Sequence, residues 1–299
     1  MKRQKKFKRI GTHNGKFHAD EVIATAILTE LFDVELTRTR DESILKELDI
    51  VYDVGGGKFD HHGLIKKYRE DGTPYAACGL IWEKFGKELL KFKRESLSEE
   101  EIQSIFDYID KSIIEGADAL DNGIWIDKTE IPLLHISAII EKFNPLWNSD
   151  KDENEAFNEA VELARTILNN AIEYKFSVLD SKEHVLRAYK NRTIPELLIL
   201  DRYCPYSSSL REIDAKEEVL YVIYPREDSY ALQSIRDENK IDKKKLPKAW
   251  AGLRGEELAA VTGVPDAIFC HTGRFIAITE TREGIMKLAK IAIEAPKED

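Results

Sequence analysis

The sequence predicts an α/β protein with two domains, in which a parallel, Rossmann-like sheet with a helical segment is followed by a smaller α/β domain. Three observations predict this class. Strand and helix patterns alternate over the first 57 residues, helical patterns dominate between about 75 and 180, and strand patterns return after 196. Alternating strands and helices are typical of parallel sheets with helical crossovers. A chain of 299 residues can form two cores of roughly 150 residues each.

The amino-terminal part predicts a parallel sheet built from strands with intervening helices. Residues 7–12 form a short strand pattern, and residues 21–32 carry apolar side chains at helical spacing. Residues 34–40 alternate like a strand, and the acidic start of residues 41–48 predicts a helix. Residues 49–57 form a strand that runs into three glycines, which predicts a turn at its end.

Four helical patterns follow. One of them begins with a serine cap and a first turn of acidic residues, which marks a helix start. The last is long enough to connect two domains. The predicted helices cover residues 76–92, 98–120, 132–143 and 153–183.

The carboxy-terminal part regains strand character. Strand patterns occur at residues 196–200, 218–224 and 266–280, and a helical pattern at 282–295 closes the chain. We therefore place the boundary near 180–195 and expect domains of residues 1–185 and 186–299.

Composition excludes several classes of protein. The net charge of −10 disfavours a protein that coats duplex nucleic acid through a broad basic face. It leaves room for a narrow cleft in which bound cations hold a phosphate ester. Three widely spaced cysteines argue against a disulfide framework and against a cysteine-based zinc site. No apolar run approaches the ~18 residues that span a bilayer, so we expect a cytoplasmic protein that does not enter a membrane.

Histidines and aspartates cluster at the predicted strand ends. Four of the seven histidines lie between residues 13 and 62, in segments that also carry aspartates. Loops at the carboxyl ends of parallel strands converge on one crevice, so these side chains are expected to meet. Imidazole and carboxylate ligands without thiolate suit Mn²⁺, Zn²⁺ or Fe²⁺, and carboxylates shared by two ions serve phosphate-ester hydrolysis. The residues are His13, His18, Asp20, Asp53, Asp60, His61 and His62.

Each of these residues has a plainer interpretation when taken alone. A loop histidine such as His13 or His18 is usually solvated or hydrogen bonded. An aspartate after a strand, such as Asp53, is more often a helix cap or a turn residue. The run Asp-His-His in its strand and loop context favours the metal site over these alternatives.

Four segments carry a resemblance to a known family. The sequence resembles the DHH phosphoesterase superfamily, and more closely the melanocyte-proliferating-gene-one exonuclease family. Its motifs GTHNGxFHxDE, DVGG, DHH and DAxDNG are matched by Gly11–Glu21, Asp53–Gly56, Asp60–His62 and Asp118–Gly123. Further similar segments, ISAIIEKFNPLW, LPKAWAGLRGEEL and TREG, extend the resemblance over nearly the whole chain.

The resemblance implies a two-metal site in the first domain, with two divalent ions, most readily Mn²⁺. The first ion would be held by His13, His18 and Asp53. The second would be held by Asp20, Asp53, His61 and an aspartate of the DALDNG segment, with Asp121 preferred and Asp118 as its rival. The superfamily usually has Asp-x-Asp where this chain has His18-x-Asp20, so the ligands of the first ion are richer in nitrogen.

The same resemblance implies roles around the metals. Asp60 would orient the neighbouring imidazole, and His62 would contact the scissile phosphate. In the second domain His271 and Arg254 would contact substrate, and Arg274 could make a bidentate contact of its own. That domain would close over the cleft in which the active site lies.

The sequence therefore predicts a metal-dependent phosphodiesterase. The resemblance implies a 3′ to 5′ exoribonuclease acting on single-stranded RNA or short oligonucleotides, and a homodimer is compatible with it. Two alternatives stay open, a small-molecule phosphoesterase or pyrophosphatase and a metal-stabilised binding protein without turnover. The aromatic residues Trp82, Phe85, Trp125 and Trp147 are expected to pack in cores or between the domains.

Overall fold

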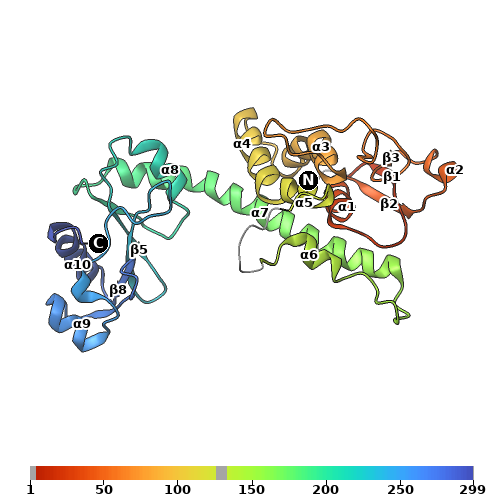
Figure 1. Cartoon of the computed structure of the whole chain (residues 1–299). Coiled ribbons are helices and arrows are strands. Elements are labelled where there is room, and N and C mark those ends of the chain that lie inside the picture. The colour runs from red at the N-terminus through yellow and green to blue at the C-terminus, as the bar shows by residue number, and fades with distance from the viewer. Residues whose placement is uncertain (1–4, 126–132, 299) are drawn as a thin grey trace. The chain divides into compact units, whose positions relative to one another are not determined.

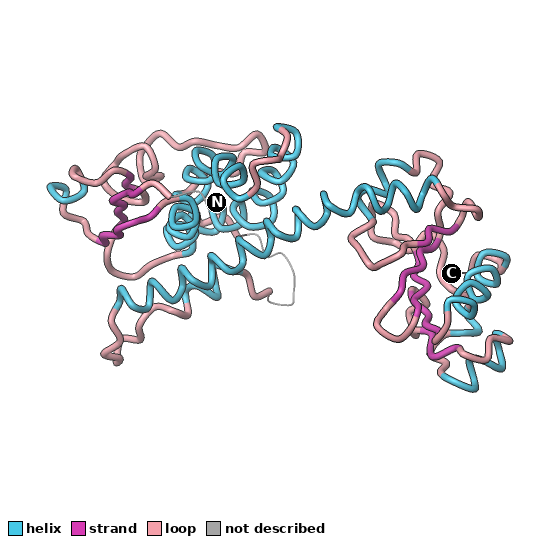
Figure 2. The backbone as a smooth tube through the Cα atoms, turned by 180° about the vertical axis from the view of Figure 1, so that it is seen from behind, coloured by secondary structure: helices cyan, strands magenta, loops and turns pink. Residues whose placement is uncertain are grey.

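The computed structural model describes residues 5–125 and 133–298 and confirms the α/β class. The chain divides into two compact units, Met1–Tyr174 and Lys175–Asp299. The division lies within one long helix, α7 (Glu153–Lys190), and the boundary expected after residue 185 lies in the same helix. Figure 1 labels elements of each unit, among them β1 to β3 and β5 and β8, and Figure 2 shows that helices border the strands of both units.

The first unit contains a three-stranded parallel sheet in the order β2-β1-β3. Its strands are β1 (Phe7–Thr12), β2 (Asp33–Arg38) and β3 (Ile50–Val51). Helix α1 (Ala19–Leu31) connects β1 to β2, and α2 (Glu42–Leu45) precedes β3. Because the strands are parallel, the loops that follow β1 and β3 leave the same edge of the sheet.

Strand β3 ends earlier than the pattern over residues 49–57 predicts. Asp53 adopts a φ of 59°, and Gly55 and Gly56 follow with φ of 82° and 68°. This left-handed backbone cannot continue a strand, and glycine adopts it without strain. The chain therefore turns directly after the short strand and returns the Asp-His-His run toward β1.

The helices of the first unit cover the sheet and follow the predicted order. Nearly every residue of α1 is buried, and α1 packs against α3. The predicted helix over 98–120 is interrupted by a π-helical turn, and the helix predicted over 132–143 is shorter, with residue 132 outside the described residues. The elements are α3 (Ala77–Lys93), α4 (Glu99–Ile109), the π-helical turn η1 (Asp110–Ile114), α5 (Glu115–Asp121) and α6 (Ile136–Glu141).

The second unit contains a five-stranded mixed sheet in the order β4-β5-β6-β8-β7. Strand β6 was not predicted, and the pattern over 266–280 forms two antiparallel strands joined by a turn. The strands are β4 (Leu197–Ile199), β5 (Tyr221–Pro225), β6 (Tyr230–Ser234), β7 (Ala267–Cys270) and β8 (Ile276–Thr279). The helices are α8 (Ser207–Ile213), the 3₁₀ turn η2 (Lys248–Trp250), α9 (Gly255–Thr262) and α10 (Arg282–Glu294).

Alternating side chains of β5 build two cores on the two faces of this sheet. Tyr221 and Ile223 pack with residues of α9 and α10, which form one core. Val222 and Tyr224 pack with Val185 of α7 and with residues of α8, which form the other. The second unit therefore has its own buried interior on both sides of the sheet.

Two of the aromatic residues expected in cores are at the surface. Trp82 is completely buried, and Phe85 packs edge-on against Phe32. Trp125 and Trp147 are 79% and 97% exposed, so they do not pack in a core; their packing between the domains stays a prediction. Among the described residues, no helix has the length and apolar character needed to cross a membrane.

Candidate metal centre

Five segments of the first unit bring histidine and carboxylate side chains together. They are the loop after β1, the first turn of α1, the turn after β3, the Asp-His-His run and the end of α5. Four overlapping groups have ligand atoms within 4.8 Å of one another. The groups are Asp53, Asp60, His61 and His62; His13, His18 and Glu21; His18, Asp20 and Asp121; and Asp20, Glu21 and Asp53.

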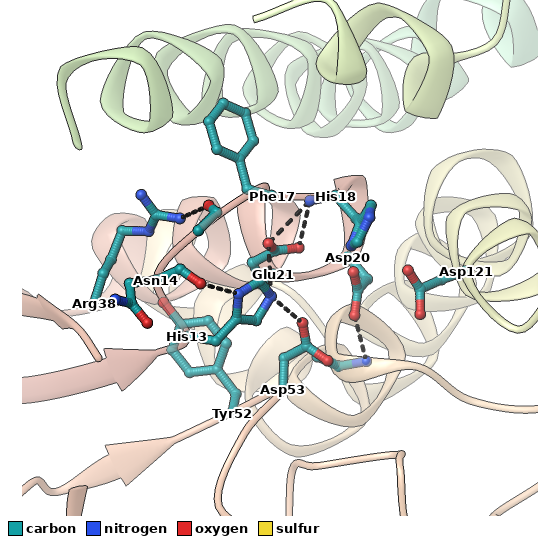
Figure 3. Close-up of polar contacts among 12 residues, drawn as sticks. His13, Asn14, Phe17, His18, Asp20, Glu21, Arg38, Tyr52, Asp53 and Asp121 are labelled. Atoms are coloured by element: carbon teal, nitrogen blue, oxygen red, sulfur yellow. Dashed lines mark hydrogen bonds and ion pairs between the residues drawn. The ribbon is translucent and has the colours of Figure 1, made fainter. Parts of the chain in front are cut away.

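His13 lies buried between two carboxylates, as Figure 3 shows. Its Nε2 is 3.1 Å from Glu21 Oε1 and 3.1 Å from Asp53 Oδ2, and its Nδ1 is 3.0 Å from the carbonyl oxygen of Asn14. Burial lowers the pKa of His13, but hydrogen bonds to Asp53 and Glu21 outweigh it and raise the pKa to about 10. The His13 imidazole therefore faces the carboxylates of Glu21 and Asp53.

Asp53 faces histidines on both sides. While its Oδ2 contacts His13, its Oδ1 is 3.3 Å from His61 Nδ1 and 3.6 Å from His62 Nδ1. Burial raises the pKa of Asp53, but hydrogen bonds and charge from His13 and His61 lower it to about 2. The positive φ of Asp53 places this carboxylate between the two halves of the cluster.

Asp20 is a completely buried carboxylate among other acids. Burial raises its pKa well above the ordinary value, and the charges of Asp53, Glu21 and Asp121 raise it further. Its Oδ2 accepts a hydrogen bond of 3.3 Å from the backbone N–H of Ala77, whereas its Oδ1 has no hydrogen-bond partner among the described residues. Such a group is unfavourable unless it is protonated or a cation is close to it.

His61 connects this region to α5. Its Nε2 is 2.8 Å from Asp121 Oδ2, and its Nδ1 lies 3.9 Å from Asp20 Oδ2. Burial lowers the pKa of His61, but hydrogen bonds to Asp121 and Asp53 raise it to about 9. Asp121 also lies beside Asp20 (Figure 3). Asp20, Asp53, His61 and Asp121 thus lie together.

Asp118 lies elsewhere. It is completely buried and contacts Arg69 Nη2 at 2.7 Å and the backbone N–H of Gly79 at 3.0 Å. Among the described residues, none of the groups that could hold a metal includes Asp118. The geometry therefore favours Asp121 over its rival as the aspartate of the DALDNG segment that faces the centre.

Asp60 and His62 lie at the exposed side of the cluster. Asp60 Oδ1 accepts hydrogen bonds from the His62 backbone N–H at 3.1 Å and from His62 Nδ1 at 2.9 Å, and Asp60 Oδ2 accepts one from Gly56 N–H at 2.7 Å. Burial raises the pKa of Asp60, but these hydrogen bonds lower it below its ordinary value. The His62 side chain is 64% exposed. Asp60 therefore orients His62, and His62 is accessible to a ligand.

Glu21 is a residue of the centre that sequence reasoning missed. It is completely buried, and it belongs to two of the groups that could hold a metal. Its two oxygens accept hydrogen bonds of 2.9 and 3.0 Å from the backbone N–H of His18, which caps α1. Its position directly after Asp20 in the quoted motif was the available signal.

We expect Glu21→Gln to weaken Mn²⁺ binding by about 10–100-fold, because it removes the negative charge that faces His13. Glutamine also serves at this position of a capping box, so helix α1 should be retained. Titration of metal-free protein with Mn²⁺, with circular dichroism alongside, measures both. Glu30→Gln is the matched control because Glu30, at the other end of α1, pairs with Lys93 and Arg165 instead. An unchanged affinity would mean that Glu21 only caps the helix.

The three predicted substrate contacts of the second unit lie around the turn between β7 and β8. The backbone N–H of Arg274 donates to the carbonyl of His271 at 2.8 Å, and Arg254 forms a β-bridge with Phe269 of β7. His271 and Arg254 are exposed. The Arg274 side chain is buried, and its Nη1 is 3.9 Å from Glu298 Oε2.

Comparison with known proteins finds similarity along almost the whole chain. Residues 9–293 match the sequence model of the MYG1 exonuclease family, which carries the description "Uncharacterised protein family (UPF0160)". The "MYG1 protein C694.04c" of Schizosaccharomyces pombe is 29% identical over 320 residues, which cover 97% of this chain and 98% of that protein. The "MYG1 exonuclease" of Mus musculus is 32% identical over 324 residues, covering 95% and 84%.

A solved structure gives a weaker match. The crystal structure of RecJ in complex with Mg²⁺ from Thermus thermophilus aligns with a TM-score of 0.30 and 14% sequence identity. The alignment covers 97% of this chain and 50% of that chain. This score is too low to establish a shared fold.

Proposed function

The chain belongs to the MYG1 exonuclease family, and from this premise we propose that it is a metal-dependent nuclease that hydrolyses phosphodiester bonds with two divalent ions, most readily Mn²⁺. Family membership confirms the resemblance seen in the four motifs. The observation that carries the proposal is the position of Asp53, whose two oxygens face His13 on one side and His61 on the other. A carboxylate in this position can bridge two ions.

The donor atoms fit divalent metal. Asp20 Oδ1 is a buried polar atom without a hydrogen-bond partner among the described residues, and the buried atoms Asp53 Oδ1 and His61 Nδ1 face each other at 3.3 Å. Nitrogen and oxygen donors without thiolate suit Mn²⁺. We assign His13, His18, Glu21 and Asp53 to one ion. We assign Asp20, Asp53, His61 and Asp121 to the other.

The side chains must lose protons to act as ligands. With pKa values of about 10 and 9, His13 and His61 carry protons at neutral pH when only carboxylates face them. Metal ions bind neutral imidazole and ionised carboxylate, so binding would release protons from this cluster. When bound, the two ions would supply a water of lowered pKa and charge for the phosphate oxygens.

The remaining roles belong to the chain's own residues. His62, which is exposed and hydrogen bonded to Asp60, would contact a non-bridging phosphate oxygen and stabilise charge that develops there. In the second unit the exposed residues His271 and Arg254 are candidates to hold the substrate beyond the scissile bond. Since related proteins bear the name exonuclease, we propose a nucleic-acid strand cleaved from one end as the substrate. Single-stranded RNA or a short oligonucleotide, cleaved from the 3′ end, is the form that the resemblance of the motifs implies.

The test is hydrolysis of 5′-labelled single-stranded RNA by protein stripped with chelator and refilled with Mn²⁺. We expect a ladder that shortens from the 3′ end, that chelator abolishes and that Mn²⁺ restores. Matching DNA, a dinucleotide and pyrophosphate are compared under the same conditions. If only pyrophosphate is consumed, the nuclease proposal fails. If only the dinucleotide is consumed, the substrate is the short oligonucleotide and not a longer RNA. If metal binds and nothing is hydrolysed, the chain is a binding protein.

A further inference from the structure

A buried ionic network lies beside the metal centre and is not part of it. Asp118 of α5 is completely buried, and its Oδ1 accepts hydrogen bonds from Gly79 N–H and Cys78 Sγ, both at 3.0 Å. Its Oδ2 is 2.7 Å from Arg69 Nη2. This carboxylate is therefore fixed from two sides, by the first turn of α3 and by Arg69.

Arg69 joins Asp118 to a second aspartate. Its Nε and Nη2 donate to the two oxygens of Asp110 at 3.0 and 2.8 Å, which makes a bidentate pair. The guanidinium lies 4.1 Å from the centroid of the Tyr75 ring, and the Arg69 side chain is only 7% exposed. A single planar group thus holds two carboxylates, and a lysine could not reproduce this geometry.

The π-helical turn explains how one arginine reaches both aspartates. Each residue of an α-helix advances by ~100°, so eight residues in a regular helix would leave Asp110 and Asp118 ~80° apart around the axis. The turn η1 (Asp110–Ile114) adds a residue to one turn. Discounting that residue leaves seven regular steps, which bring the two side chains within ~20° of each other.

The network joins two segments, residues 61–69 and helix α5, that also meet at the contact between His61 and Asp121. Asp121 follows Asp118 by less than one turn of α5 and reaches His61 Nε2 at 2.8 Å. His61 begins the segment that leads to Arg69. The contacts His61–Asp121 and Arg69–Asp118 therefore join the same two segments at two places.

We propose that Arg69 is a positioning residue that, through Asp118 and Asp110, sets α5 so that Asp121 completes the metal centre. The inference rests on the proposed function, because it assigns Asp121 to one of the two ions. It also gives the first aspartate of the DALDNG segment a role: Asp118 holds the helix, and Asp121 faces the metal.

Gly79 provides a second way to disturb the network. A Cβ atom at residue 79 would collide with the Asp118 carboxylate and with the ring of Tyr75. Gly79→Ala therefore displaces Asp118 without a change of charge, whereas Arg69→Lys keeps the charge and removes the fork. The two variants disturb the Asp118 carboxylate in different ways. An effect that both share would therefore come from the changed position of that carboxylate.

Metal-free Arg69→Lys and Gly79→Ala are titrated with Mn²⁺, and their affinities for the two ions are compared with those of the unmodified chain. We expect the affinity for the ion assigned to Asp121 to fall about 10–100-fold, as for loss of a group that orients a ligand. The affinity for the other ion should stay within about threefold. In the refilled protein, kcat for RNA should fall while KM changes little. Arg165→Lys is the matched control, because Arg165 donates from Nε and Nη2 to a single oxygen, Glu30 Oε1, at 3.0 and 2.9 Å, away from the centre.

The outcomes separate the two proposals. Unchanged Mn²⁺ affinities in folded Arg69→Lys and Gly79→Ala would overturn the positioning role. The role would also be overturned if both affinities fell equally in these variants and fell by the same amount in Arg165→Lys. Those results would leave the proposed function standing if the unmodified chain binds two ions and cleaves RNA. If the unmodified chain binds no Mn²⁺, the proposed function fails and the positioning role falls with it.

Discussion

Asp53→Asn will reduce RNA hydrolysis by about 1,000-fold or more, because Asp53 is the only carboxylate among the described residues that contacts both His13 and His61. A neutral amide cannot bridge two cations, so the affinity for at least one Mn²⁺ ion should fall with the activity. A thousandfold loss corresponds to about 4 kcal/mol of transition-state stabilisation, which is within what two metal ions supply. Single-turnover hydrolysis and Mn²⁺ titration of the same preparation measure the two effects.

Asparagine is the informative replacement because of the backbone at this position. The φ of 59° at Asp53 is tolerated by asparagine better than by alanine. The backbone hydrogen bond from Asp53 N–H to the carbonyl of Phe59, at 3.0 Å, does not involve the side chain. Asp53→Gly, which relieves the backbone and also lacks the carboxylate, is the control and should be equally inactive. Activity within tenfold of the unmodified chain in Asp53→Asn would refute the bridging role.

The sequence was sufficient to predict the parts of the centre that depend on local order along the chain. The strand before His13 and the helix after Asp20 follow from apolar spacing, and parallel strands place the loops after β1 and β3 at one edge. The α/β class and the closing helix α10 follow in the same way. Strand β6 was missed because it is short and no strong apolar pattern marks where it begins and ends.

The contacts that select among neighbouring carboxylates could not be predicted from local pattern. Asp118 and Asp121 lie three residues apart in one motif, and the contacts of Asp118 come from Arg69 and Gly79, which are about 40–50 residues away along the chain. Glu21 follows Asp20 directly, and its contact with His13 depends on how the loop closes over α1. Pairing across such separations arises from tertiary packing.

The exposed aromatic residues have the same explanation. Trp82 carries its apolar side chain at the spacing of other buried residues of α3, and it is buried. Trp125 and Trp147 lie outside helices, where no periodicity indicates burial, and neither packs in a core. The spacing of apolar residues therefore predicts burial of an aromatic side chain only where that residue lies in a helix or a strand.

His62→Ala will lower kcat for RNA by about 100–1,000-fold with little change in Mn²⁺ affinity, because we assign His62 to the phosphate and not to a metal. His62 Nδ1 is hydrogen bonded to Asp60 Oδ1 at 2.9 Å, which leaves Nε2 available for a phosphate oxygen. The ring lies 4.3 Å from that of His61, so the donor is next to the proposed site of the second ion. Single-turnover rates and Mn²⁺ titration together distinguish this role from ligation.

The exposed loop that follows His62 supplies the control. Ile65 is 96% exposed, and Ile65→Ala should retain the rate and the metal affinity because it removes a solvated side chain. Asp60→Asn should give an intermediate loss, since the imidazole remains and only its orientation and charge stabilisation weaken. A tenfold or greater loss of Mn²⁺ affinity in His62→Ala would make His62 a ligand, and an unchanged rate would exclude it from the reaction. A loss of rate alone, shared in part by Asp60→Asn, is the result that the geometry of the Asp60–His62 pair predicts.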